Sequence, residues 1–556
     1  MDGGRPGVAA TLRALNGALG RPAALWVKES GARNLRHRDF LAPRAALSAA
    51  FPGGQVPPEA VSAVPSLRGP AVLPLRVCRQ TPAGLAVQVH RPEAFQRLLG
   101  ALPGPPAPAA GPRTGCVVLH CPALRSSPAA LRPRHLRSVL LADHLAQLLR
   151  AQGVDVRLVP ALSEERSWDV LRQLRVCWPS GSGGSALADA ISALKAALGR
   201  CPCATACEQG PGTAEGVISK VHLKSFVEQQ GLLGYDPNLD VLLVTERTLQ
   251  SLAELQEAVL QCPVSDPTAL PTSHLPSVPS FCIVHVVNCE EEFQQQQLDV
   301  LWRILDPGAH TKHLVCGPVK ASEHPGHSHR AAPDGSQGWC RGGPQPVVSC
   351  LGAGGFSTWE WSKLCMMAPT FSTDEAWTEV IDTLTVAAIR FEMLSTAHRS
   401  QVGHISTKGT KSGAFVMYNC ARLATLFSTF QRAVEQGIYP PLPPVSELNF
   451  SCLREEGEWL LLFNYLLPFP EVLQQAAQLP PPSKGIRITA STETVCKFLI
   501  QLSMDFSSYY NRVHILGEPF PHLFDQMFAR LQLLGAVRDV FHSALATLHL
   551  PPLSQI

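Results

Sequence analysis

The stretch PHLFDQMFARLQLLGAVRDVFHSALATLHL at residues 521–550 decides the fold of the C-terminal third of the chain. Its large apolar side chains recur at steps of three or four residues without a break, which is the period of an α-helix. Similar apolar helical segments precede it, and the proline runs at 440–444 and 480–482 fall between them, where proline does not interrupt a helix. The pattern predicts an all-helical bundle over residues 370–556. Its apolar positions are Leu523, Met527, Leu531, Leu534, Val537, Phe541, Leu545 and Leu548.

The segment upstream, residues 114–369, has the pattern of a parallel sheet. A short buried strand, CVVLHCPAL at 116–124, is followed by a leucine-rich helix and then by the strand VDVRLV at 154–159. DVLLVTE at 240–246 and SFCIVHVVN at 280–288 are typical of further buried strands. We therefore expect a Rossmann-like domain here. Three stretches rich in Gly, Pro and Ser, at 178–214, 262–280 and 322–358, are predicted to be loops or disordered inserts.

A Pro/Gly-rich stretch at 103–113 predicts a linker, which separates a small α+β domain at residues 1–102. Helices are expected at TLRALNGAL (11–19) and FLAPRAALSAAF (40–51), a strand at LAVQVH (85–90), and a helix at HRPEAFQRLLGAL (90–102). The fold class is thus multidomain, α/β plus all-α.

The charge is distributed unevenly along the chain. Residues 1–175 carry 23 Lys and Arg, 22 of them Arg, against 10 Asp and Glu, a net charge of +13; the remaining 24 basic and 34 acidic residues give −10. An Arg-rich region of this kind suits a nucleic-acid backbone, because guanidinium groups pair with phosphates and release counterions. The alternative is a solvated basic surface without such a partner.

Composition also bounds the location of the chain. No apolar run reaches the roughly 20 residues needed to cross a bilayer, and the N-terminal stretch lacks the apolar segment of a signal peptide. We therefore expect a soluble, cytoplasmic protein. The 17 cysteines lack framework spacing, so we expect reduced thiols and no disulfides. They also lack paired CxxC spacing, so no metal site is expected.

Several motifs in order resemble the arginyl-tRNA synthetases, class I enzymes whose helical anticodon-binding domain is named after an Asp-Ala-Leu-Arg motif. In this chain they are VAAIRFEMLS (386–395), GAFVMYNCARL (413–423), FSSYYNRVHIL (506–516) and ARLQLLGAVRDV (529–540). Gly535, Ala536, Val537 and Arg538 stand at the motif, so two of its four residues are kept. The resemblance implies a DALR-type bundle and a degenerate Rossmann-like domain.

The ATP-binding motifs of the family are not retained. Aligning the family's Leu-Arg-Ser with Leu136, Arg137 and Ser138 places Arg132, Pro133, Arg134 and His135 on the His-x-Gly-His motif. That motif needs its first His to stabilise phosphate charge and its Gly to let adenine approach the backbone. Arginine replaces both, so we predict that adenylate does not form. A literal His-Pro-Gly-His at 324–327 and a Lys-Gly-Thr-Lys-Ser at 408–412 stand in the wrong order or context for the two class I motifs.

Residues for reading tRNA are better kept. Flat rings that stack on unpaired anticodon-loop bases, beside Arg side chains that hold phosphates or base edges, are what selective RNA reading requires. The alternative is that the aromatics are core residues and the arginines structural. The candidates on the bundle are Tyr418, Arg422, Tyr509, Tyr510, Arg512, Arg530 and Arg538, and those for the tRNA backbone or elbow are Arg33, Arg36 and Arg38.

The chain as a whole resembles a catalytically inactive relative of arginyl-tRNA synthetase. That resemblance implies a protein that selects arginine tRNAs and presents them to a SAM-dependent methyltransferase that makes 3-methylcytidine. No catalytic residue, cofactor, DNA or membrane partner is expected for the chain itself. Two alternatives stay open, an active synthetase-like ligase and a protein-interaction scaffold that has lost RNA binding.

Overall fold

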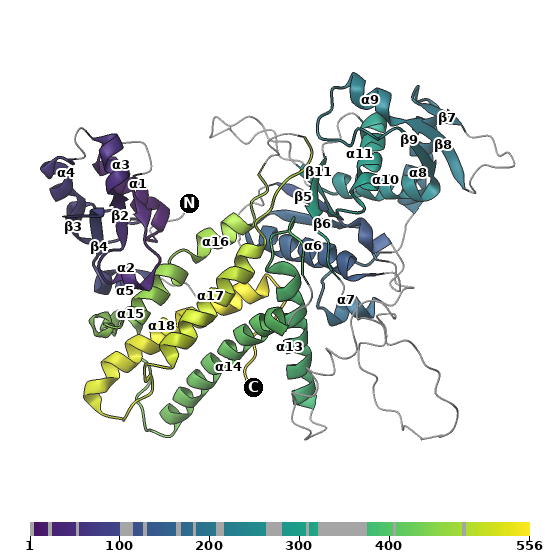
Figure 1. Cartoon of the computed structure of the whole chain (residues 1–556). Coiled ribbons are helices and arrows are strands. Elements are labelled where there is room, and N and C mark those ends of the chain that lie inside the picture. Colours follow the sequence, from purple (N-terminus) through teal and green to yellow (C-terminus); the bar gives the residue numbers. More distant parts are fainter. Residues whose placement is uncertain are drawn as a thin grey trace, which may run out of the picture.

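The structure, a computed structural model, describes most of the chain in three connected parts (Figure 1). An antiparallel sheet with helices, a parallel sheet with helices, and a helical bundle follow one another along the chain, which confirms the predicted fold class. The predicted insert at 322–358 lies outside the described residues. Those are 5–20, 25–51, 55–100, 115–125, 131–162, 168–181, 185–206, 216–262, 281–306, 311–320, 375–403, 407–480 and 485–555.

The C-terminal bundle is built from long helices, as the apolar periodicity predicted. In α18 the positions Leu531, Leu534, Val537, Phe541 and Leu545 are all buried, so the repeating stripe faces the core. The Lys-Gly-Thr-Lys-Ser stretch opens a helix instead of forming a loop. The elements are α13 (Glu375–Leu394), α14 (Thr407–Glu435), α15 (Glu456–Leu461), a π-helical turn η8 (Leu462–Leu466), α16 (Phe469–Ala476), α17 (Glu493–Tyr510) and α18 (Pro521–Ala546).

The central domain contains a parallel sheet of order β11-β10-β5-β6, which confirms the predicted strand–helix–strand unit. Its strands are continuous runs of Val, Ile and Leu because helices cover them. Helix α6 connects β5 to β6 and is buried along most of its length. The elements are β5 (Cys116–His120), η3 (Pro122–Arg125), α6 (Pro133–Ala151), β6 (Asp155–Val159), α7 (Asp169–Gln173), β10 (Phe281–Asn288), α11 (Glu292–Leu305) and β11 (Thr311–Cys316).

A second, antiparallel sheet of order β7-β8-β9 lies beside the parallel sheet and corrects two predictions. The stretch DVLLVTE forms β9 in this sheet and does not extend the parallel one. The predicted insert at 178–214 contains a helix and a strand, because SALADAISALKAALG has a helical apolar repeat that its Gly-rich flank obscures. The elements are α8 (Ser185–Gly199), β7 (Ala204–Ala206), β8 (Val217–His222), α9 (Leu223–Gln229), β9 (Val241–Thr245) and α10 (Glu246–Leu260).

The cysteine prediction is wrong at one pair. Cys116 on β5 and Cys262 after α10 are joined in a disulfide, with their Cα atoms 5.9 Å apart. They are 146 residues apart in sequence, so only the packing of α10 on the sheet brings them together. Of the predicted insert at 262–280, Cys262 is described and residues 263–280 are not.

The N-terminal domain is an antiparallel sheet of order β1-β2-β4-β3 with helices on it. FLAPRAALSAAF was expected to be one helix, but Phe40–Pro43 pairs with β4 as a strand and the helix begins only at Arg44. The pyrrolidine ring of Pro43 sits at the N-cap of this helix. The elements are α1 (Val8–Ala18), β1 (Val27–Lys28), α2 (Ala32–Leu35), β2 (Phe40–Pro43), α3 (Arg44–Ala50), α4 (Pro58–Ala63), β3 (Leu75–Thr81), β4 (Gly84–Val89) and α5 (Arg91–Leu99).

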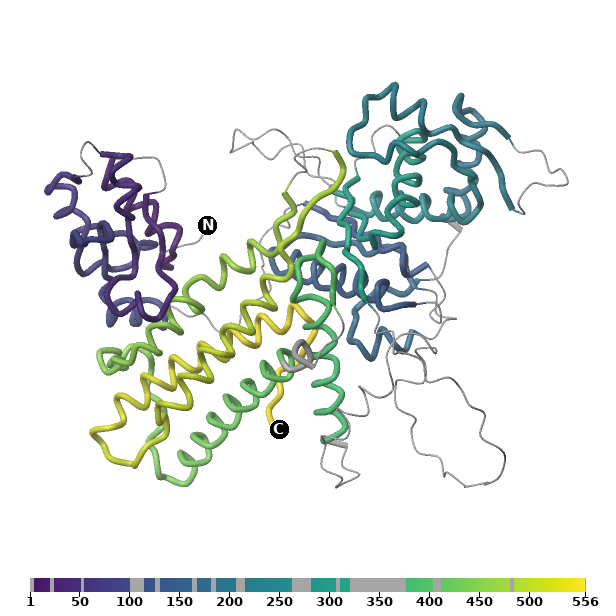
Figure 2. The backbone as a smooth tube through the Cα atoms, viewed as in Figure 1, coloured from purple at the N-terminus to yellow at the C-terminus, as the bar shows by residue number. Residues whose placement is uncertain are grey.

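The N-terminal domain, purple in Figure 2, lies against the bundle. Its α2 contacts α15, and side chains of β1 and β2 contact η8. Trp459 is buried at this contact and its indole Nε1 donates a 2.8 Å hydrogen bond to Asp39 Oδ1. The ring of Phe40 packs edge-on against Phe463, and Lys28 Nζ donates to Asn464 Oδ1 at 2.7 Å. Apolar rings and satisfied polar groups therefore fix the two domains against each other.

The central domain is joined to the bundle by a buried ion pair. Both terminal nitrogens of Arg390 on α13 lie 2.9 Å from Asp143 Oδ2 on α6. His549 Nδ1 reaches the same oxygen at 3.0 Å, and Arg390 also donates to the carbonyl of Leu174. Asp143 and the neighbouring His144 are both fully buried because the bundle covers α6.

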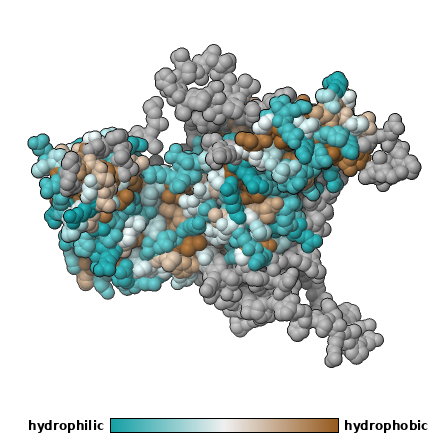
Figure 3. Space-filling model, turned by 45° about the horizontal axis from the view of Figure 1, so that its top comes forward, coloured by the Kyte–Doolittle hydropathy of each residue, from teal (hydrophilic) through white to brown (hydrophobic). Residues whose placement is uncertain are grey.

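No helix in the described part of the chain is long and apolar enough to span a bilayer. On the face shown in Figure 3, hydrophilic residues cover much of the described surface, with smaller apolar patches between them.

Candidate nucleic-acid interface

Three of the predicted RNA-reading residues form one surface cluster, Tyr418, Arg422 and Tyr510. The Arg422 guanidinium carbon lies 5.3 Å from the ring centroid of Tyr418 and 4.4 Å from that of Tyr510. Tyr418 is 45% exposed, while Arg422 and Tyr510 are half-buried. Two rings from different helices and a cation between them thus present a flat, positively charged surface to solvent.

The position of Arg422 is fixed by neighbours on α17. Its Nη1 donates to Ser507 Oγ at 3.1 Å and its Nη2 to Asn511 Oδ1 at 2.6 Å. No carboxylate among the described residues pairs with it, so its charge stays available to an anionic ligand. Ser507 and Asn511 were not singled out from the sequence, because only the packing of α17 on α14 brings them to Arg422.

Two predicted readers, Tyr509 and Arg530, are structural instead. Tyr509 is 1% exposed and its hydroxyl donates to Glu458 Oε1 at 3.2 Å. Arg530 Nε donates to the same carboxylate oxygen at 2.8 Å. Gly457 lets the Tyr509 ring pack closely, since a Cβ there would lie 2.8 Å from Tyr509 Cδ2. Tyr509 is a core residue, so the prediction that it reads RNA is wrong, while Arg530 is a partly buried partner of the same carboxylate.

The remaining two bundle candidates differ from each other. Arg512 is exposed just past α17, where its Nε donates to the Ser508 carbonyl at 3.0 Å. Arg538, at the position of the name-giving motif, lies over the Phe427 ring at 4.5 Å and is 3.4 Å from Asp539. Arg512 can contact RNA freely, whereas Arg538 already has an aromatic and an acidic neighbour. Tyr509, three residues before Arg512, faces the core and does not share this exposed surface.

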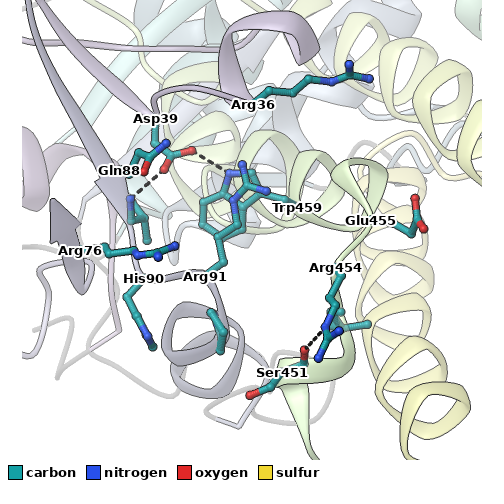
Figure 4. A pocket seen from close by; sticks show the side chains of 13 residues that line it. Arg36, Asp39, Arg76, Gln88, His90, Arg91, Ser451, Arg454, Glu455 and Trp459 are labelled. Atoms are coloured by element: carbon teal, nitrogen blue, oxygen red, sulfur yellow. Dashed lines mark hydrogen bonds between the residues drawn. The ribbon is translucent and has the colours of Figure 1, made fainter. Parts of the chain in front are cut away.

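A basic pocket lies where the N-terminal domain meets the bundle, with a volume of about 520 Å³. Arg36, Arg76 and His90 come from the N-terminal domain, and Ser451 and Arg454 come from the bundle (Figure 4). Arg36, Arg76 and Arg454 are exposed, and no carboxylate of a described residue pairs with them. We call these three side chains, with the pocket they line, the basic pocket.

The acidic residues of the basic pocket do not cancel its charge. Asp39 is buried, accepting hydrogen bonds from Trp459 Nε1 and, at 2.8 Å, from the Val89 amide. Burial raises the pKa of Asp39 to about 6. Arg91 is held by Glu456 at 3.1 Å and by the carbonyl of Leu35 at 2.6 Å. Glu455 also lines the pocket and is exposed, so one carboxylate faces solvent beside the three guanidinium groups of Arg36, Arg76 and Arg454. Guanidinium groups suit phosphate oxygens.

The predicted group of Arg33, Arg36 and Arg38 is therefore divided. Arg33 is exposed on α2. Arg38 is an intradomain partner, its Nε 2.7 Å from Glu29 Oε1. Only Arg36 lines the basic pocket. Arg76 and Arg454 were missed because a strand and a loop 378 positions apart in the sequence supply them.

The degenerate ATP motif lies at the N-terminus of α6, as predicted, but two of its side chains are paired with carboxylates. Arg134 Nη1 is 3.1 Å from Glu290 Oε2, and His135 Nε2 is 3.0 Å from Glu291 Oε1. The Arg132 amide donates to His135 Nδ1 at 3.2 Å, so His135 caps the helix. Pro133 occupies the first turn, where its missing N–H costs nothing. Nucleotide phosphates would meet two carboxylates here.

Arg137, from the stretch aligned with the family's Leu-Arg-Ser, has a structural role. It is fully buried and donates to the carbonyls of Gly317 at 2.8 Å and Ser400 at 2.7 Å. It therefore ties α6 to the segments after β11 and α13.

Comparison with known proteins identifies the family. The DALR, N-terminal domain pattern matches residues 6–104, and the DALR anticodon binding domain pattern matches residues 416–556. A Mus musculus protein named DALR anticodon-binding domain-containing protein 3 is 50% identical over the full length of both chains. Its Danio rerio counterpart is 41% identical over 99% of both. The chain belongs to the DALR anticodon-binding domain-containing protein 3 family.

Solved structures show the fold of this DALR protein. Thermus thermophilus arginyl-tRNA synthetase superimposes with a TM-score of 0.57 at 16% identity, covering 99% of this chain and all of the enzyme. The Plasmodium falciparum enzyme gives 0.56 at 11% identity, covering 99% of this chain and 98% of that one. The predicted resemblance is thus confirmed, and the anticodon-binding domain supports a tRNA-binding role.

Proposed function

We propose that this DALR protein is a non-catalytic tRNA-binding protein that selects arginine tRNAs through the anticodon region. The observation that carries the proposal is the cluster of Tyr418, Arg422 and Tyr510, which lies within the matched anticodon-binding domain. Unstacked anticodon-loop bases pack on exposed rings, and Arg422 is held where it can reach a phosphate or a base edge. Arg512 follows the cluster along the chain and extends it.

The basic pocket supplies the second part of the tRNA site. The bundle from 414 to 556 holds 9 basic and 11 acidic residues, so it contributes selectivity more than long-range attraction. Arg36, Arg76 and Arg454 would hold backbone phosphates, with Arg33 on the same N-terminal domain. Because Trp459 and Asp39 fix that domain to the bundle, both parts can act on one tRNA.

Arg36, Arg76 and Arg454 changed together to Gln should weaken binding of all tRNAs and lower the salt dependence. Each lost phosphate contact removes about 0.7–0.9 from the slope of log K against log salt, so the triple variant should lose about 2–3 units. Filter binding between low and moderate salt measures this. Arg172→Gln, an exposed arginine paired with Asp169 on the central domain, is the matched control. An unchanged slope in the triple variant would remove the basic pocket from the proposed site.

We infer that the chain does not form an aminoacyl adenylate. The carboxylates of Glu290 and Glu291 hold Arg134 and His135 at the helix end where the family binds ATP. A triphosphate would have to displace these pairs against charge repulsion. This supports the pseudo-synthetase assignment over an active ligase.

The purified chain should therefore catalyse no ATP–pyrophosphate exchange with arginine and arginine tRNA. The double variant Arg132→His, Arg134→Gly should stay inactive as well, since Glu290 and Glu291 remain in place. An exchange rate above an enzyme-free baseline in the unmodified protein would restore the synthetase alternative.

Catalysis would come from a partner, a SAM-dependent tRNA methyltransferase that makes 3-methylcytidine in arginine tRNAs. The loop after β5, CPALR at 121–125, has no glycine that would let a nucleotide or methyl donor come close to the backbone. This supports the proposal that one chain selects the tRNA and another catalyses the methylation. The DALR protein would then act as the specificity subunit, in the cytoplasm. The scaffold alternative requires that the Tyr418 cluster bind no RNA.

A further inference from the structure

Three histidines line up across the parallel sheet. In the register of the strands, His285 on β10 pairs with His120 on β5 and with His313 on β11. Paired residues of neighbouring strands point to the same face, so the three rings form a row. The ring of His285 is edge-on to both neighbours, with centroids 5.0 Å from His120 and 5.2 Å from His313. All three side chains are fully buried.

The side chain of Asp299, on α11, lies beside two of these histidines, His285 and His313. One ligand atom from each of His285, Asp299 and His313 lies within 4.8 Å of the others. His313 Nε2 is 3.7 Å from Asp299 Oδ2, which is too long for a hydrogen bond. Two ligands held at about 2.0 Å by a tetrahedral zinc ion are about 3.3 Å apart, so a small side-chain movement would bring these atoms to bonding distance.

Three of the four ring nitrogens of His285 and His313 lack a hydrogen-bond partner among the described residues. His285 Nε2 and both ring nitrogens of His313 make no hydrogen bond to any described residue. Buried polar atoms are otherwise almost always paired.

The surrounding groups would hold such ligands in place. His120 Nδ1 and His285 Nδ1 are 2.8 Å apart, so this hydrogen bond fixes the His285 ring and leaves its Nε2 for a metal. The hydroxyls of Tyr235 and Thr311 donate to Asp299. Metal-binding histidines and carboxylates in proteins are characteristically oriented by partners of this kind.

We propose that His285, His313 and Asp299 bind one zinc ion, with a water molecule as fourth ligand. Two imidazoles and a carboxylate are a ligand set that zinc accepts. The site is buried, so its role is structural: the ion would cross-link β10, β11 and α11. From the sequence, no metal site was expected. The three proposed ligands come from two strands and a helix, so they share no local spacing that would identify them in the sequence. This site is independent of the proposed RNA binding.

Metal analysis of the full-length chain, purified without a histidine tag or chelator, tests the site. We expect about one zinc per chain, and a lower Tm after chelation. His313→Asn and Asp299→Asn should lose the zinc. The matched control is His144→Asn, which removes another fully buried histidine, one that contacts the Thr547 carbonyl, and should keep the zinc even if it lowers stability.

Cobalt titration of the chelated wild-type protein gives a readout that needs no variant. Binding at this site should produce the visible absorption of a tetrahedral Co²⁺ centre, and zinc should displace it. Wild-type protein that contains no zinc and takes up neither ion would overturn the proposal. So would a folded His313→Asn protein with the full zinc content.

Discussion

Replacing Arg390 by Met is expected to lower the free energy of unfolding by about 3–5 kcal/mol, the effect of removing one partner from a buried ion pair. Among the described residues, the variant leaves the buried Asp143 carboxylate with His549 and the Cys177 amide as its remaining hydrogen-bond partners. It also leaves the carbonyl oxygens of Leu174 and Arg175 without the guanidinium that binds them. The cost arises from desolvated polar groups, so it exceeds that of an exposed pair.

Urea unfolding of the variant, with Arg172→Gln as an exposed ion-pair control, measures this effect. The double change Arg390→Met, Asp143→Leu should recover much of the loss, because it removes both charges. Burial raises the pKa of Asp143, but His549 and Arg390 together hold it below its ordinary value. The stabilisation is therefore present above about pH 4 and is lost as the pH falls further. A loss below about 1 kcal/mol would show that the pair does not join the two domains.

Tyr418→Ala is expected to weaken binding of arginine tRNA by about 5- to 150-fold, since stacking on one ring contributes about 1–3 kcal/mol per base. Tyr418 is exposed, so its removal should leave the fold intact. Tyr510→Ala should act in the same direction, because its ring also flanks Arg422. The loss should be larger for arginine tRNA than for an unrelated tRNA, since the anticodon loops differ while the backbones do not.

Two control variants separate RNA reading from structure. Trp377→Ala removes an exposed aromatic ring on α13 and should not change the affinity. Tyr509→Phe removes the hydroxyl bound to Glu458 and should lower stability without changing tRNA selectivity. Equal losses for both tRNAs with Tyr418→Ala would contradict anticodon reading, and no loss would exclude the cluster from the site.

Much of the fold follows from local pattern. The step of three or four residues in 521–550 predicts α18, and the Val/Ile/Leu runs of β5 and β10 predict buried parallel strands. The local pattern predicted a helix at Phe40–Pro43, where a strand is followed directly by a helix. It also missed α8, which follows a Gly-rich stretch. These elements depend on pairing with β4 and packing on α10, which are distant in the sequence.

The site was predicted less completely, and Tyr509 and Tyr510 show why. Adjacent residues on a helix point about 100° apart, so one ring faces the core and the other the surface. Tyr509 is the buried one because it contacts Glu458 and Gly457, about 50 positions earlier in the sequence. The pair of Asp143 and Arg390 was missed for the same reason, since the partners are 247 residues apart.

Isolation of the chain from its own cells at gentle salt, followed by sequencing of the bound tRNAs and identification of the bound proteins, tests the central claim most directly. If the protein binds tRNA selectively and a partner supplies the catalysis, arginine tRNAs should be enriched over total tRNA and a methyltransferase should be recovered with them. The Tyr418→Ala variant should lose that enrichment. Recovery of proteins without tRNA would contradict the claim and leave the bundle as a protein-interaction scaffold.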